Sequence, residues 1–211
     1  MRLTILFPII LIVGIAVAGT AMTLRVRSMA RDESVDLPTV GRVSDFTLTE
    51  RSGRAVTLED LRGYVWVADF IFTRCSGACP MMASKMYELQ EQTSGRDDFR
   101  LVSFTLDPEY DTPEQLEKYS RTVVDAGPRW LWLTGDKQTL HSLSQSDFLL
   151  SVTEQDSEVE PVLHSQKLVL VDAQTRIRGY YDGTEGPELE RLLEDIGKLR
   201  GGVARGLSSG P

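Results

Sequence analysis

The chain has 211 residues, of which 41% are hydrophobic and 26% charged, and a formal net charge of −8. Four of its 23 Lys and Arg residues precede the first acidic residue, Asp32, so the rest of the chain carries a net charge of −12. So acidic a chain lacks the basic surface that nucleic-acid binding requires, and we expect no nucleic-acid partner. Its length is sufficient for one domain with a hydrophobic core of its own.

The N-terminus is dominated by an apolar run of 22 residues from Leu3 to Leu24. A run of this length exceeds the h-region of a signal peptide and is long enough to span a bilayer as a helix. We therefore predict a transmembrane anchor over residues 1–27 and a linker over residues 28–40. A cleaved signal peptide is the alternative, because small residues occupy positions 18–21.

Two features of the sequence disagree about the side of the membrane on which the domain lies. Arg25, Arg27 and Arg31 follow the apolar run and only Arg2 precedes it, which favours a cytoplasmic domain. Paired cysteines instead favour an oxidising compartment. Because the charge difference is small, we predict a membrane-anchored protein whose soluble domain lies on the extracytoplasmic, periplasmic side.

The predicted elements of the domain, residues 41–199, alternate between strands and helices. Two β-type segments around Ser52 and Gly53 predict an N-terminal hairpin, and the apolar run over residues 64–72 is typical of a central strand buried on both faces. The later predictions are, in order, a helix over 80–93, a strand over 99–106, a helix opening at Thr112, a strand over 130–133, a helix capped by Asp136, a hairpin of 167–171 with 177–181, a helix around 189–196 and a flexible tail over 200–211. This order predicts an α/β fold, with a central mixed β-sheet flanked by helices.

The only two cysteines, Cys75 and Cys79, share the loop CSGACP that follows the predicted central strand. Open α/β sheets place their sites at this end of their strands. The start of the next helix, together with Arg74, predicts a stabilised Cys79 thiolate. Such a pair can form a redox disulfide, hold a soft metal, or do both at different times. A purely structural disulfide is the weakest of these interpretations, because closing so short a loop removes little chain entropy.

A metal site needs a donor beyond the two thiolates, and the chain has two histidines. His141 falls in the middle of a predicted helix, on its solvent face, whereas His164 directly precedes a strand. Zinc requires a fourth ligand, but Cu(I) is satisfied by two sulfurs and one imidazole, so this inventory fits copper better than zinc. A lone histidine is more often a packing or surface residue, so spacing alone leaves the role of His164 open.

Acidic residues add two further candidates. Asp69 lies inside the apolar central strand, where a carboxylate is costly unless it is paired or protonated. It either accepts a proton from the dithiol or is a satisfied structural carboxylate. The acidic run over residues 154–160 is typical of a solvated loop, and alternatively attracts copper ions or a basic partner surface.

Three segments together resemble the SCO/SenC family: FTRCSGACP over residues 72–80, LDPEYDTP over 106–113, and Leu163-His164-Ser165 before a strand. That family consists of membrane-anchored, thioredoxin-like copper proteins associated with assembly of the dinuclear copper centre of cytochrome c oxidase. The resemblance covers residues 41–199 and implies a thioredoxin-like fold. Many members have Pro-Asp-Val between the cysteines, where this chain has Ser-Gly-Ala. The missing acidic residue bears on partner contacts and leaves the ligand set intact.

The resemblance implies that Cys75, Cys79 and His164 bind copper, as Cu(I) or Cu(II), and that Asp107 lies against these ligands or is an outer ligand. It favours a copper chaperone that delivers copper to the copper-binding subunit of cytochrome c oxidase. The alternative is a membrane-anchored thiol–disulfide oxidoreductase in which Cys75 and Cys79 are the catalytic pair that reduces target cysteines. The two functions are compatible, because copper loading requires the reduced pair. A peroxiredoxin-like peroxidase is a third interpretation.

Overall fold

The computed structural model describes residues 37–75, 77–123, 126–154 and 162–206. The chain divides into two compact units between Asp36 and Leu37, and the first unit lies outside the described residues. The predicted anchor over residues 1–27 and most of the linker fall in that unit, so they remain predictions. Within the described ranges, no helix is both long enough and apolar enough to cross a membrane.

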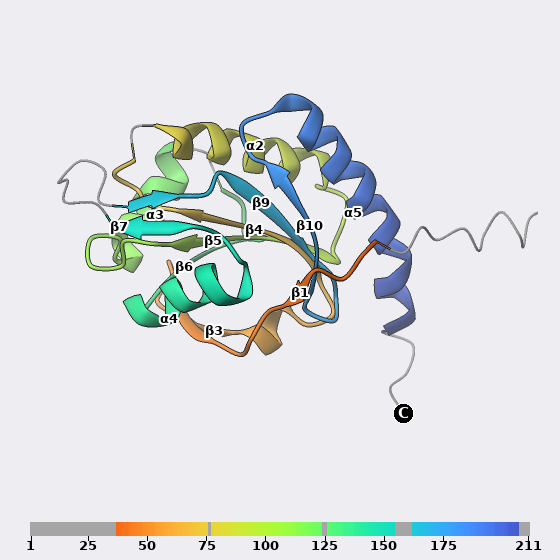
Figure 1. Ribbon diagram of the computed structural model, residues 1–211, viewed down its shortest axis with the longest axis horizontal. Coiled ribbons are helices and arrows are strands. Elements are labelled where there is room, and N and C mark those ends of the chain that lie inside the picture. The colour runs from red at the N-terminus through yellow and green to blue at the C-terminus, as the bar shows by residue number, and fades with distance from the viewer. Residues whose placement is uncertain (1–36, 76, 124–125, 155–161, 207–211) are drawn as a thin grey trace, which may run out of the picture. The chain divides into compact units, whose positions relative to one another are not determined.

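An eight-stranded mixed sheet forms the centre of the second unit, with its strands in the order β1-β10-β9-β4-β5-β6-β2-β3 (Figure 1). The strands are β1 (Gly41–Arg42), β2 (Thr47–Glu50), β3 (Ala55–Thr57), β4 (Val65–Ile71), β5 (Phe99–Thr105), β6 (Trp130–Thr134), β9 (Lys167–Val171) and β10 (Arg176–Asp182). β4, β5 and β6 run parallel, and every other pairing in this sheet is antiparallel. The predicted mixed sheet is therefore confirmed. The predicted N-terminal hairpin is β2–β3, which extends the sheet beyond β6.

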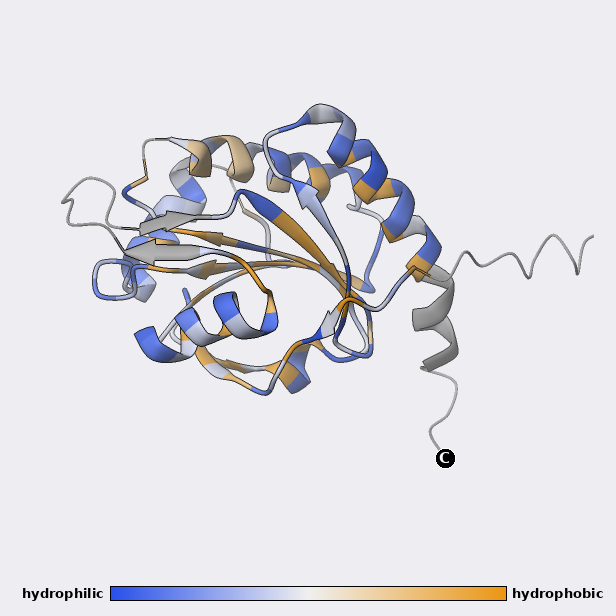
Figure 2. Ribbon diagram, viewed as in Figure 1, coloured by the Kyte–Doolittle hydropathy of each residue, from blue (hydrophilic) through white to orange (hydrophobic). Residues whose placement is uncertain are grey.

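β4 lies at the middle of the sheet, and all seven of its residues are buried. Figure 2 shows that hydrophobic residues concentrate on the central strands, while the helices carry hydrophilic residues on their outer faces. A strand covered by helices on both faces needs a continuous apolar run, and β4 has one that is broken only by Asp69. The cysteine loop follows β4 directly, so a rigid, fully buried strand positions it.

Helices cover both faces of the sheet, with α2 and α5 above it and α4 below it in Figure 1. The helical elements are η1 (Leu58–Leu61), α2 (Ala78–Gln92), α3 (Pro113–Val123), α4 (Lys137–Ser142), η2 (Leu143–Asp147) and α5 (Gly186–Gly206). Asp136 caps α4 as predicted, because its carboxylate accepts a hydrogen bond from the Thr139 amide at 2.8 Å.

Three helical features differ from the sequence predictions. α2 begins at Ala78, two residues before the predicted start, because Pro80 is tolerated anywhere in a first turn whose amides are unpaired. α4 continues into the π-helical turn η2, which has no local sequence signal. α5 is helical to Gly206 and so extends into the predicted flexible tail, while residues 207–211 lie outside the described part of the chain.

A second, two-stranded sheet pairs β7 (Val152–Glu154) with β8 (Val162–His164). The strands are antiparallel, with Val152 opposite His164. We predicted only an acidic loop in this region, because strands of three residues are too short to show a clear alternation. Residues 155–161, most of that acidic run, lie outside the described residues. The hairpin is important because it fixes the backbone at His164.

Candidate metal centre

The two cysteines lie at the junction between β4 and α2. The Cys75 amide donates to the Phe72 carbonyl at 3.2 Å in a tight turn, and Gly77 is the residue that precedes α2. Cys79 falls in the first turn of the helix and is fully buried, whereas Cys75 is only partly buried. Both are free thiols. The two residues therefore differ in burial, because Cys79 is enclosed in the core and Cys75 packs against the core while it stays partly exposed.

The electrostatic environment of Cys79 differs from the one predicted. Burial is the main cause that raises the pKa of the Cys79 thiol, and a hydrogen bond to the Cys75 thiol raises it further. The prediction of a stabilised Cys79 thiolate is therefore wrong for the metal-free dithiol. The helix start turns this side chain into the core, where loss of hydration outweighs the favourable helix dipole.

A second loop, after β5, is hydrogen-bonded to the cysteine loop through Asp111. The buried Asp111 carboxylate accepts from the Thr73 amide at 3.1 Å, from the Thr105 hydroxyl at 2.5 Å and from the Thr73 hydroxyl. Burial raises the pKa of Asp111, although these hydrogen bonds oppose the shift. Sequence reasoning missed this role, since Asp111 was noticed only as part of LDPEYDTP. The sequence did offer one signal for this role, because Asp111 is the second aspartate, after Asp107, in a loop next to the predicted site.

Asp107, from the same loop, lies beside Arg74. Its Oδ2 accepts from Arg74 Nη2 at 2.6 Å and from Arg74 Nε at 3.0 Å. The guanidinium also lies over the Tyr110 ring, 4.4 Å from its centroid. Asp107 is therefore close to the cysteine loop, and its carboxylate is held by Arg74, the residue that precedes Cys75. Its role beside the metal ligands stays a prediction.

His164 ends β8, and backbone hydrogen bonds fix the two residues that follow it. The Ser165 amide donates to the Ser151 carbonyl at 3.1 Å, and the Gly183 amide donates to the Gln166 carbonyl at 2.8 Å. β9 follows at once and runs antiparallel to β4, so its beginning lies beside the end of β4, where the cysteine loop starts. The topology thus places the backbone of His164 at the cysteine edge of the sheet.

The side chain of His164 lies outside the described part of the structure. Among the side chains that are described, no three from His, Cys, Asp or Glu form a cluster able to hold a metal ion. The described residues therefore supply two free thiols in one loop, and the third donor remains a prediction.

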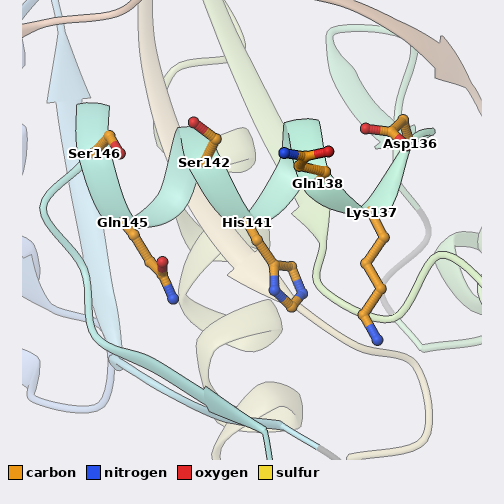
Figure 3. Close-up of a pocket in the computed structure, with 7 residues that line it drawn as sticks. All are labelled: Asp136, Lys137, Gln138, His141, Ser142, Gln145 and Ser146. Carbon is orange, nitrogen blue, oxygen red and sulfur yellow. The ribbon is translucent and has the colours of Figure 1, made fainter.

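His141 lines a different surface, a shallow groove along α4 and η2 (Figure 3). Its ring Nε2 lies 3.2 Å from the Leu106 carbonyl, which can only accept, so this nitrogen donates. The ring is therefore half-buried against the end of β5, and the prediction that it faces solvent is wrong in that respect. Neither cysteine lines this groove.

Asp69 is the one charged residue within β4, and it is completely buried. Neither of its carboxylate oxygens has a hydrogen-bond partner at ordinary distance and angle among the described residues. Burial raises its pKa to about 7. A negative charge on Asp69 would also raise the pKa of the Cys79 thiol, so the two groups belong to one electrostatic environment. A hydrogen bond with Ser103, which lies opposite Asp69 on β5, opposes the upward shift, so both interpretations from sequence stay predictions.

The raised pKa of Asp69 predicts that stability falls as pH rises. The folded state retains a proton that the unfolded state loses above about pH 4, so the free energy of unfolding decreases until the pH passes about 7. Asparagine does not titrate, so Asp69→Asn should lack this loss of stability. Between pH 5 and pH 8, the free energy of unfolding of the parent chain should fall by about 2–3 kcal/mol more than that of Asp69→Asn. Urea unfolding at both pH values measures this difference. Equal pH dependence in the two proteins would contradict it.

Comparison with known proteins identifies the family. The SCO1/SenC family model matches residues 38–200. The chain belongs to the SCO1/SenC family. Among the relatives, the SCO1 protein homolog of Bacillus subtilis (strain 168) is 33% identical over 156 residues, which are 73% of this chain and 80% of the relative.

Solved SCO1/SenC structures share the fold. A SCO1/SenC family lipoprotein from Bacillus anthracis str. Ames is 30% identical, with a TM-score of 0.70 over 75% of this chain and 95% of its own. BsSco, described as a member of the Sco family of cytochrome c oxidase assembly proteins with a disulfide switch, is 29% identical, with a TM-score of 0.69 over 78% of this chain and 97% of its own. Bradyrhizobium japonicum ScoI with copper bound is 21% identical, with a TM-score of 0.64 over 75% and 99% of the two chains, and supports the fold alone. The SCO/SenC resemblance and its fold are therefore confirmed.

Proposed function

We propose that this SCO1/SenC protein binds copper through Cys75, Cys79 and His164 and delivers it to the copper-binding subunit of cytochrome c oxidase. The observation that carries the proposal is the placement of two free thiols in one loop at the end of β4, with Cys75 partly exposed and Cys79 buried. Thiolates select soft ions, and a two-sulfur pair with one nearby imidazole satisfies Cu(I). A putative copper-binding protein of Stutzerimonas stutzeri, 30% identical over 176 residues, supports this choice of metal, and BsSco supports the choice of partner.

The difference in burial assigns different tasks to the two cysteines. Copper binding must remove the proton that burial keeps on Cys79, so loading is coupled to proton release. Cys75 is the sulfur that an incoming ligand can reach, because part of its surface is exposed. Ligand exchange with the partner's cysteines therefore begins at Cys75, while Cys79 keeps hold of the ion from inside the loop.

Thiol–disulfide exchange is the second candidate function, and the same asymmetry favours it. The Cys75 thiolate would attack a target disulfide and form a mixed disulfide, releasing one target thiolate. Cys79, four residues further along the same loop, would then displace the second target thiolate and close the Cys75–Cys79 disulfide. The target gains two electrons and the pair loses two. The disulfide switch described for BsSco supports this candidate.

We also propose that residues 1–27 anchor the protein in the membrane, with the copper-binding domain over residues 41–199 on the extracytoplasmic side. The paired thiols suit an oxidising compartment, and membrane attachment is supported by the lipoprotein relative from Bacillus anthracis. Attachment to the membrane would keep the copper-binding domain close to a membrane-bound oxidase. Protease accessibility of the domain in intact spheroplasts tests its side of the membrane.

His164→Ala separates the two functions. We expect Cu(I) affinity to fall by about 10²-fold, because one of three ligands is lost, while dithiol exchange with a model disulfide is retained. Competition with a chromophoric Cu(I) chelator and a disulfide-reduction assay measure the two properties. His141→Ala is the matched control, since that ring lines a separate groove. Equal loss of both properties in His164→Ala, or loss of neither, would contradict the assignment.

A further inference from the structure

Arg74 is the one basic side chain bound to Asp107 among the described ion pairs of this loop, and it directly precedes Cys75. Two of its nitrogens, Nη2 and Nε, contact a single carboxylate oxygen of Asp107, at 2.6 and 3.0 Å. The pair is partly shielded from water, with 31% of the Arg74 side chain and 10% of the Asp107 side chain exposed. Charge-assisted contacts at these distances are stronger than those of an exposed pair.

Two further contacts restrict where this ion pair can move. The Arg74 guanidinium lies over the Tyr110 ring, and the Asp107 amide donates to the Thr105 hydroxyl at 3.0 Å. Thr73, the residue before Arg74, is bound to Asp111 of the same loop. The cysteine loop and the Asp107 loop are therefore joined at two consecutive residues, and Asp107 is held by a cation beside the candidate metal centre.

We propose that Arg74 determines the oxidation state of the copper that this site prefers, by occupying Asp107 and favouring Cu(I) over Cu(II). The inference rests on the proposed copper-binding function. Cu(II) gains from a carboxylate oxygen and from added negative charge, whereas Cu(I) is satisfied by two sulfurs and one nitrogen. Arg74 neutralises the carboxylate that would otherwise serve Cu(II).

The charge of the site itself acts in the same direction. Two thiolates and one neutral imidazole carry a net charge of −1 with Cu(I) and of zero with Cu(II). A guanidinium in the adjoining residue therefore attracts the Cu(I) form and gives no such gain to the Cu(II) form. Removing Arg74 both frees Asp107 as a donor and removes that attraction.

The potential of the Cu(II)/Cu(I) couple tests the inference, because it measures the ratio of the two affinities. We expect Arg74→Gln to favour Cu(II) at least tenfold, which lowers the potential of the copper-loaded full chain by about 59 mV or more. The double variant with Asp107→Asn should recover most of that shift. Voltammetry of the loaded protein gives the potential, and Cu(II) electron paramagnetic resonance reports whether an oxygen donor is gained.

Arg62→Gln is the matched control, because Arg62 forms a surface ion pair with Glu59 of η1 and lies at the amino end of β4. It should leave the potential unchanged. An unchanged potential in Arg74→Gln would overturn the inference. A double variant, Arg74→Gln with Asp107→Asn, whose potential is as low as that of Arg74→Gln alone would show that Asp107 does not act as a donor to Cu(II). A parent chain that binds no copper would instead refute the proposed function, and the inference with it.

Discussion

Cys79→Ser is expected to lower Cu(I) affinity by about 10²–10³-fold. Four-ligand zinc sites bind with about 10–16 kcal/mol, or roughly 2.5–4 kcal/mol for each ligand, and a thiolate replaced by a hydroxyl loses most of that share. The buried hydroxyl should also destabilise the metal-free protein by about 1–3 kcal/mol, since Cys79 is fully enclosed. Anaerobic competition with a Cu(I) chelator measures the affinity, and urea unfolding measures the stability.

Cys75→Ser is the matched variant for this experiment. Its affinity should fall by a similar factor, because both sulfurs are ligands. Its stability should stay close to that of the parent, because Cys75 is only partly buried. Retained tight binding in either variant would show that the pair does not act as a two-sulfur site. The comparison also separates loss of a ligand from loss of the fold, which Cys79→Ser alone does not.

Asp111→Ala is expected to cost about 3–5 kcal/mol of folding free energy, or roughly 6–20 °C in Tm. The substitution leaves the Thr73 amide and two threonine hydroxyls without their acceptor in a buried site. It also releases the cysteine loop from the loop after β5, so Cu(I) affinity should fall as well. Thermal unfolding of the metal-free protein measures the first effect.

Asp45→Ala is the control for Asp111→Ala. The Asp45 side chain is 92% exposed and has only a 3.9 Å ion pair with Arg62, so its loss should change stability by less than about 0.5 kcal/mol. Asp111→Asn keeps one acceptor oxygen, so its loss of stability should lie between those of Asp111→Ala and Asp45→Ala. Equal Tm values for Asp111→Ala and Asp45→Ala would contradict the tethering role of Asp111.

The central part of the fold was predictable because its signals are local and strong. A continuous apolar run predicted β4, and a capping aspartate predicted the start of α4. Met82 and Met86, one helical turn apart in the helix predicted over residues 80–93, are both fully buried. In contrast, β7 and β8 have three residues each, and the turn η2 continues α4 without a change in pattern. Contacts with segments distant in the sequence determine β7, β8 and η2, so their local sequence does not predict them.

The candidate site was predictable in its residues but not in its electrostatics. The motif segments identified Cys75, Cys79 and Asp107, which the structure brings to one edge of the sheet. The burial of Cys79 was not predictable, because the helix start alone suggested a stabilised thiolate and only the packed core reverses that effect. The Arg74–Asp107 pair joins residues 33 positions apart, and nothing in either segment specifies this contact.

X-ray absorption at the copper edge of the Cu(I)-loaded protein tests the ligand set most directly. We predict two sulfur scatterers and one nitrogen scatterer in the parent chain, one sulfur fewer in Cys75→Ser, and no imidazole signal in His164→Ala. Copper coordinated by one sulfur or none in the parent, or an imidazole signal that persists in His164→Ala, would contradict a site built from Cys75, Cys79 and His164.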